Sequence, residues 1–280
     1  MDPFIFMRMV RGSVLPALFY GAPVWASVLS SSTRLDVIDS FLATAARLAF
    51  SLERSTSSEA ALVLAGLEPA RYQILRRLVC FHLCRHRSRL TDAIPPRTFL
   101  HFTSAFELGR TWFQRSVRGR TLSDPVPRRH RLIREGIDRA LRLEWRARWT
   151  QSAVGTALRE VFPLAGSAWS PVSAAVPSGE RLALTLIARF LTSHCQFGEF
   201  SMPWGADVET VCPFCGGIFS RAHMLWECSG LVRERAVLVE GVGSVHMGDL
   251  SWFATRRVRQ LGRFLVAARQ LAKRGFGSRD

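Results

Sequence analysis

The chain contains almost no lysine. Lys273 is the only one among 38 basic residues, so the remaining 37 are arginines. Tyrosine is also scarce, with two residues, and six cysteines in 280 residues are too few for a small secreted domain held together by disulfides. Two explanations of the arginine bias stay open: a GC-rich coding sequence, or a need for guanidinium groups that bind phosphate through paired hydrogen bonds.

The apolar content excludes a disordered basic tail. Hydrophobic residues make up 48% of the sequence and the mean hydropathy is +0.10, whereas disordered basic segments are poor in apolar residues. At roughly 150 residues per domain, the length indicates about two folded units. The longest uncharged stretch, residues 12–33, resembles a signal peptide or membrane anchor. Pro16, Gly21 and Pro23 interrupt it, however, so we expect a buried helix followed by a turn, and no membrane association.

Positive charge is concentrated in two segments of the chain. Of the net formal charge of +16, residues 71–148 carry +13 and residues 251–280 carry +7, while the rest is slightly acidic. Concentrated basic charge is typical of proteins that bind a polyanion, most often nucleic acid. We therefore expect RNA or DNA as the partner.

One cluster of residues has the spacing of a metal site. Cys212, Cys215, His223 and Cys228 form the pattern C-x2-C-x7-H-x4-C. Two cysteines separated by two residues fit a tight turn that directs both thiolates at one ion, and glycines follow the second cysteine. Three thiolates and one imidazole leave no position for a catalytic water, so the sequence predicts a structural Zn²⁺ site.

This zinc site has two alternatives. Cys195 and His194 are substitute candidates for one ligand, and a chance cluster of buried cysteines is the competing interpretation. A zinc deaminase is excluded because the chain contains no His-x-Glu sequence. It also contains no nucleophile elbow, no glycine-rich phosphate loop and no Asp-Asp pair, so we assign no catalytic residue.

Apolar periodicity predicts an all-α fold. Two of the expected helices carry an apolar row: Ile133, Ile137, Leu141, Trp145 and Trp149 on the helix over 128–149, and Ala254, Val258, Leu261, Leu265, Ala268 and Ala272 on the last. We expect helices from Thr33, from a capping box of Thr56 and Glu59 to Gly66, from Pro69, over 128–149, over 180–192, and from Asp249 to just before Gly275. The expected division is a helical segment over 1–96, an Arg-rich helical connector over 97–162, a linker over 163–179, and a zinc-knuckle module with a basic C-terminal helix over 180–280. The predicted nucleic-acid contacts lie on two of these helices and are Arg128, Arg129, Arg131, Arg134, Arg139, Arg142, Arg146, Arg256, Arg257 and Arg263.

Four short elements, in order along the chain, resemble the reverse transcriptases of non-LTR (LINE-type) retrotransposons. The first comprises Leu15-Pro16, Tyr20-Gly21-Ala22 and Trp25; the second comprises Arg54, Thr56, Ala60, Ala65-Gly66 and Pro69. The third comprises Arg189, Thr192 and His194, with Ser193 where the family has glycine. The fourth is the cysteine-histidine cluster, followed by Arg233 and Arg235, with Arg221-Ala222 in place of the usual Glu-Thr.

This resemblance implies a thumb-like segment over 1–96 that follows the catalytic palm, and a C-terminal CCHC zinc knuckle. The chain has no aromatic-x-Asp-Asp sequence, so we do not expect it to polymerise by itself. The implied function is to grip template RNA or target DNA, together with the rest of a reverse transcriptase, inside the cell in the nucleus or cytoplasm. The alternatives are a zinc-stabilised protein-interaction module and a non-functional transposon fragment.

Overall fold

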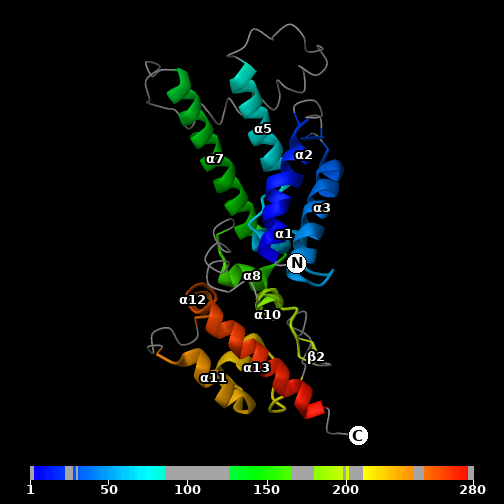
Figure 1. Cartoon of the computed structure of the whole chain (residues 1–280), viewed down its shortest axis with the longest axis vertical. Helices are drawn as coiled ribbons and strands as arrows, with labels where there is room; N and C mark the ends of the chain where they lie inside the picture. The colour runs from blue at the N-terminus through cyan, green and yellow to red at the C-terminus, as the bar shows by residue number, and fades with distance from the viewer. Residues whose placement is uncertain are drawn as a thin grey trace. The chain divides into compact units, whose positions relative to one another are not determined.

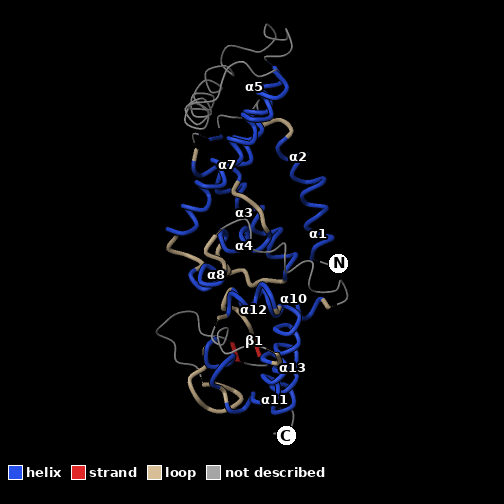
Figure 2. Tube along the Cα trace, turned by 90° about the vertical axis from the view of Figure 1, so that its left-hand side faces the viewer, coloured by secondary structure: helices blue, strands red, loops and turns tan. Residues whose placement is uncertain are grey.

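The structure is a computed structural model, and it describes residues 3–22, 28–29, 31–85, 126–164, 180–197, 200–201, 211–241 and 249–276. These residues are mostly helical, which confirms the predicted all-α class (Figure 1). The described strands, β1 (Gln196–Phe197) and β2 (Phe200–Ser201), form one short antiparallel pair (Figure 2). Within the described residues we find no helix with the length and apolar character needed to cross a membrane.

The described helices have the following order along the chain. Up to residue 164 they are α1 (Pro3–Met9), the π-helical η1 (Val10–Val14), α2 (Leu15–Phe19), α3 (Ser32–Phe50), α4 (Ser58–Ala65), α5 (Ala70–Arg85), α7 (Val126–Gln151) and α8 (Thr156–Val161). From residue 180 they are α10 (Arg181–Leu191), η4 (His223–Glu227), η5 (Ser229–Leu231), α11 (Val232–Val239), α12 (Leu250–Arg256) and α13 (Val258–Phe276).

The chain forms two compact units, and each combines segments that are distant in sequence. One unit contains Met1–Met7, Ala43–Gly66 and Ser152–Asp280, and the other contains Arg8–Leu42 and Leu67–Gln151. The expected division at residue 96 and most of the expected linker over 163–179 lie outside the described residues. That division therefore stays a prediction.

The second unit is built around the packing of α7 on α5. On α7, four members of the predicted apolar row are each at most 4% exposed: Ile137, Leu141, Trp145 and Trp149. The side chain of Ile133, the fifth member, lies outside the description. The ring of Trp145 lies 6.1 Å from that of Tyr72 on α5. Burying a large aromatic side chain contributes roughly 2–3 kcal/mol, so this row fixes which side of α7 faces α5 and which side faces water.

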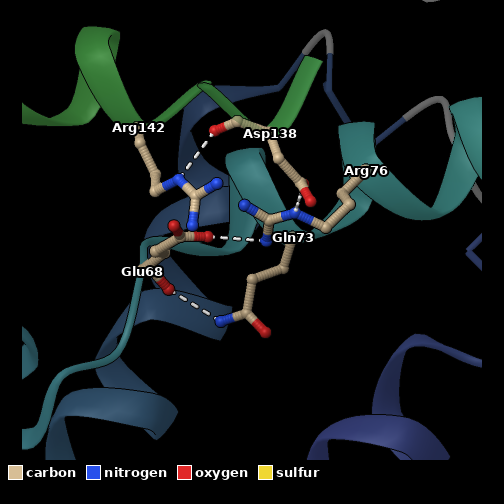
Figure 3. A network of polar contacts seen from close by, with 5 residues as sticks. All are labelled: Glu68, Gln73, Arg76, Asp138 and Arg142. Atoms are coloured by element: carbon tan, nitrogen blue, oxygen red, sulfur yellow. Dashed lines mark hydrogen bonds and ion pairs between the residues drawn. The ribbon is translucent and has the colours of Figure 1, made fainter. Parts of the chain in front are cut away.

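A polar network supplements this apolar contact (Figure 3). The guanidinium of Arg76 on α5 pairs with Glu68, at 2.6 Å, and with Asp138 on α7. The backbone carbonyl of Glu68 accepts a hydrogen bond from Gln73, and that of Asp138 accepts one from Arg142 at 3.1 Å. One arginine thus connects two carboxylates from separate segments, and the register of α7 against α5 is set by charge as well as by packing.

The first unit has α10 at its centre. Most side chains of α10 are buried, and α13 packs along it. At Gly262 of α13 a Cβ atom would lie only 3.1 Å from the Cβ of Ala183 and 3.3 Å from Ile187. The absence of a side chain at this position permits the two helices to approach closely.

Helices α3 and α10 end in the same way. Ser51 and Ser193 adopt positive φ angles of 51° and 60°, which lie in the left-handed region that favours glycine. In both cases the following N–H group reaches back to an arginine carbonyl: Leu52 to Arg47 at 2.9 Å, and His194 to Arg189 at 2.7 Å. These are Schellman-type ends in which serine stands at the glycine position.

The expected starts of α3 and α4 each differ from the structure by one residue. Helix α3 begins at Ser32 rather than at Thr33, and the cap of α4 is Ser57, whose hydroxyl accepts from the Ala60 N–H at 3.2 Å. The predicted capping box of Thr56 and Glu59 is therefore wrong, because the capping residue is Ser57 rather than Thr56. Glu59 accepts a hydrogen bond from the hydroxyl of Ser152 instead. Adjacent serine and threonine side chains are equally capable caps, so local sequence does not choose between them.

The predicted C-terminal helix is two helices. Asp249 caps the first as expected, with its carboxylate accepting from the Trp252 N–H at 2.9 Å. The backbone then leaves the helical region at Arg257 (φ −125°, ψ 33°), between α12 and α13. The predicted apolar row nevertheless continues across this break. Its members Ala254, Val258, Leu261, Leu265, Ala268 and Ala272 are all at most 3% exposed.

Substitution of Ser193 by glycine is expected to stabilise the fold. Glycine adopts positive φ without the steric cost that serine bears, so Ser193→Gly should raise the free energy of unfolding by about 0.5–1 kcal/mol. Ser40→Gly, at an exposed position inside α3, should lower it by a similar amount. Urea unfolding of the two variants measures both values; equal destabilisation by both would contradict the left-handed conformation at Ser193.

Candidate metal centre and basic helices

The four predicted metal ligands lie together in the first unit. The Sγ atoms of Cys212, Cys215 and Cys228 and a ring nitrogen of His223 are all within 4.8 Å of one another. Cys212 Sγ lies 3.7 Å from Cys228 Sγ, and Cys215 Sγ lies 3.1 Å from His223 Nε2. Four donors at these distances are close enough to bind a single metal ion.

A tight turn presents the first two cysteines. The N–H of Cys212 donates to the Gly217 carbonyl at 2.6 Å, and the N–H of Gly216 donates back to the Cys212 carbonyl at 2.9 Å. Gly216 has φ +78°, and a Cβ on Gly217 would lie 3.3 Å from the His223 ring. The first glycine thus adopts a left-handed conformation, and the second leaves room for a ligand.

A short helical turn presents the other two ligands. The N–H of His223 donates to the Ser220 hydroxyl at 3.0 Å at the start of this turn. After the π-helical segment η4, the N–H of Cys228 donates to the carbonyl of His223 at 2.8 Å. The wider π turn brings two residues that are five positions apart to the same side.

The two halves of the site contact each other at Gly230. A Cβ at this glycine would overlap the Phe214 carbonyl and lie 2.8 Å from the Cβ of Phe214. Arg235 donates to the Cys228 carbonyl at 2.6 Å from α11. Contacts around the ligands, rather than the ligands alone, orient the cysteine side chains.

Arg221 attaches the ligand-bearing turn to α8. Its guanidinium donates to the Ala157 carbonyl at 2.9 Å and pairs with Glu160 at 2.5 Å. In the sequence, Arg221 is only a departure from the family pattern, and nothing there indicates a role for it. The acceptors lie more than 60 residues away, so no local pattern could have identified them.

Burial divides the site into two chemically different halves. Cys212 and Cys228 are buried, and burial raises the pKa of both thiols, that of Cys228 to about 12. Cys215 is exposed, and the hydrogen bond from the Gly217 backbone N–H lowers its pKa to about 7. Without a metal ion, the buried pair therefore holds protons at neutral pH while Cys215 is partly ionised.

The substitute ligand candidates do not join this cluster. Cys195 is buried in the same unit, and its Sγ contacts the Leu186 carbonyl at 3.8 Å. His194 supplies the N–H that ends α10. Among the described residues, the ligand atoms that come together are those of the predicted four.

The arginines predicted to contact nucleic acid lie on α7, α12 and α13, except that Arg257 lies between the last two helices. On α7, Arg131, Arg134, Arg139 and Arg142 are exposed and Arg146 is half-buried. Arg131 pairs with Glu135 at 2.8 Å. The side chains of Arg128 and Arg129 lie outside the description.

The three predicted arginines near the C-terminus have a different environment from those of α7. Arg256 and Arg263 are exposed, whereas Arg257 is half-buried. The Arg257 guanidinium lies 5.8 Å from the centre of the Trp252 ring and donates to the Gly241 carbonyl at 3.3 Å. Arg257 therefore has a structural role in holding the break between the two helices, and phosphate contacts by the ten arginines stay predictions.

Comparison of the chain with protein-family models, with curated proteins and with solved structures finds no match.

Loss of a buried ligand is expected to abolish metal binding. The purified chain should hold about one metal ion, and Cys228→Ser should reduce this to near zero because three donors remain around a buried position. Cys80→Ser alters a half-buried cysteine of α5 outside the cluster and should retain the metal. Elemental analysis of both variants measures the stoichiometry; full metal content in Cys228→Ser would exclude this site.

Metal binding is expected to release protons. At pH 7.5 the thiols of Cys212 and Cys228 are protonated in the metal-free site, since their pKa values are raised, and Cys215 is mostly ionised. Coordination by thiolates should therefore release about two protons, and affinity should rise about a hundredfold per pH unit near this pH. Calorimetric titration in two buffers of different ionisation enthalpy measures the number; a value of zero would contradict the assignment of the buried thiols as ligands.

Proposed function

We propose that the metal is Zn²⁺ and that its role is structural. Three thiolates and one imidazole are the donor set of closed zinc sites, and in a tetrahedron with Zn–S bonds of about 2.3 Å two sulfurs lie about 3.8 Å apart. The Sγ atoms of Cys212 and Cys228 are 3.7 Å apart. All four positions are supplied by the chain, so Zn²⁺ here would cross-link two turns without activating water.

We further propose that the chain is a nucleic-acid-binding C-terminal portion of a retrotransposon reverse transcriptase. The observation that carries this proposal is that the third element of the resemblance contacts residues just before the second element, more than 130 residues earlier in the chain. Arg189 donates to the Ser51 carbonyl at 2.7 Å and pairs with Glu53 at 3.3 Å. Glu53 directly precedes the second element of the resemblance, and Arg189 opens the third.

Backbone conformation gives independent support at two positions. Ser193 occupies the site where the family has glycine, and its φ of 60° is one that glycine prefers. Gly66, in the Ala-Gly pair of the second element, has φ 62° and ends α4. In each case the resemblance indicates glycine where the backbone is left-handed.

The task implied for this portion is binding rather than catalysis. Exposed arginines of α7 and of the C-terminal helices would neutralise phosphates of template RNA or target DNA, and the zinc knuckle would hold the unit that carries the second set. Such contacts depend strongly on salt and little on base sequence. The partners would be RNA or DNA and the rest of the polymerase, in the nucleus or cytoplasm.

The structure does not favour the alternative of a protein-interaction module that uses the apolar row of the C-terminal helix. That row is buried in the chain itself, where α13 packs against α10 and α11. It is therefore not free to receive a partner chain.

Reversing exposed charges of α7 is expected to weaken nucleic-acid binding. Neutralisation of about four phosphates predicts that affinity for a short RNA hairpin falls about a hundredfold between 50 and 200 mM salt. Arg131→Glu, Arg134→Glu and Arg139→Glu, combined, should lower the affinity by at least about tenfold at 100 mM salt and flatten this dependence. Fluorescence anisotropy with a labelled hairpin measures both quantities.

A matched variant separates local from overall charge. Arg8→Glu, Arg34→Glu and Arg181→Glu change the net charge equally at exposed positions outside the predicted contacts. They should retain most of the affinity. Salt-independent binding by the unmodified chain, or equal losses in the two variants, would count against the proposed function.

A further inference from the structure

Helix α13 has a basic face opposite its buried face. The buried side chains include Val258, Leu261, Leu265, Ala268 and Ala272. Arg263, Lys273 and Arg274 are exposed on the other side of the same helix. Because the buried row and the close approach at Gly262 fix the rotation of α13 about its axis, these cations are held facing water.

Neither α13 nor the preceding α12 supplies an acidic residue that could neutralise this basic face. Between Leu250 and Phe276 the sequence contains no aspartate or glutamate. Helix α7, in contrast, carries three acidic residues, and one of them pairs with Arg131. Among the described residues, the side chains of Arg263, Lys273 and Arg274 make no ion pair. Their charge is therefore available to an external anion.

The spacing of the cations fits a repeating anion rather than a small one. Arg263 and Arg274 are eleven residues apart, which corresponds to about 16 Å along a helix at 1.5 Å per residue. A single phosphate group cannot contact side chains so far apart. One strand of a duplex carries a phosphate about every 3.4 Å along the helix axis, so the same length covers about five phosphates.

The side chains beside these cations indicate a duplex rather than a single strand. Proteins that bind single strands combine basic grooves with exposed aromatic rings on which bases stack. Among the described residues, α12 and α13 expose no large apolar side chain, and Trp252 is only half-exposed and lies beside the Arg257 guanidinium. A face that presents cations and no stacking surface can contact only the phosphate backbone of a nucleic acid.

We propose that the basic face of α13, formed by Arg263, Lys273 and Arg274, binds the phosphate backbone of a nucleic-acid duplex without reading its sequence. The proposal rests on the proposed function, since it specifies which form of nucleic acid the chain binds and through which helix. It adds Lys273 and Arg274 to the contacts predicted from sequence. Phosphate contacts position a protein on a duplex but carry no base information.

The test compares a triple variant with a charge-matched control in the full, metal-loaded chain. Arg263→Gln, Lys273→Gln and Arg274→Gln remove the basic face, while Arg8→Gln, Arg34→Gln and Arg181→Gln remove three exposed charges elsewhere. Fluorescence anisotropy measures binding to a labelled 16-base-pair DNA duplex, the RNA duplex of the same sequence and the corresponding single strands, each at several salt concentrations. Circular dichroism verifies that both variants retain their helical content.

The expected result is a change in salt dependence that is confined to duplexes. The slope of log affinity against log salt should become less steep by about 2.7 for the α13 variant, as three lost phosphate contacts predict, and by less than about 1 for the control. The unmodified chain should bind duplex more tightly than single strand. An unchanged duplex slope in the α13 variant, or tighter binding of single strands by the unmodified chain, would overturn the proposal.

Failure of this inference is distinguishable from failure of the proposed function. If the unmodified chain binds neither duplexes nor single strands, the proposed function fails and this inference fails with it. If it binds, and the α7 variant weakens binding while the α13 variant does not, the proposed function stands and only the inference about α13 is wrong.

Discussion

The burial of α10 is the constraint on which the metal-bearing unit depends, because this helix contacts α8, α13 and the residue that follows α3. Along its side, the missing side chain of Gly262 permits α13 to approach Ala183 closely. At its C-terminal end, the backbone of Arg189 accepts the helix-ending hydrogen bond, and its guanidinium reaches the Ser51 carbonyl at 2.7 Å. Which face of α13 meets water, and hence which charges are presented, follows from how these neighbours surround α10.

In the proposed function, the metal centre and the basic helices have separate physical roles. Three thiolates around a divalent ion carry net negative charge, so the knuckle itself is not an attractive site for phosphate. Its proposed role is mechanical, since a bound ion would cross-link two turns that also meet where Gly230 lies against Phe214. The positive charge lies on helices whose buried rows determine their orientation. A polyanion would therefore be attracted by the helices, and the metal would preserve the fold of the unit that carries α13.

Features with a local signal could be predicted from the sequence. The spacing of Cys212, Cys215, His223 and Cys228 identified ligands that lie together, because each pair of ligands lies on one short turn with its own local hydrogen bonds. The apolar row from Ala254 to Ala272 was also predicted, since helical periodicity is a property of the segment itself. The choice of Ser57 over Thr56 as a cap and the break at Arg257 escaped prediction, because tertiary contacts decide between nearly equivalent local alternatives.

Long-range contacts had no signal in the sequence. Arg189 and Ser51 are 138 residues apart, and the Arg221 contacts with Ala157 and Glu160 connect segments more than 60 residues apart. Arginine is so common in this chain that an arginine with a structural role cannot be distinguished from a solvated one by residue type. The same difficulty applies to the arginine bias itself: coding composition and phosphate recognition both remain compatible with it.

The central claim is that three sulfurs and one nitrogen of this chain enclose a zinc ion. X-ray absorption spectroscopy at the zinc edge of the purified full chain tests it most directly. The account predicts a first coordination shell of three sulfurs at about 2.3 Å and one nitrogen at about 2.0 Å. A shell of oxygen and nitrogen only, or a chain that binds no zinc at all, would contradict it.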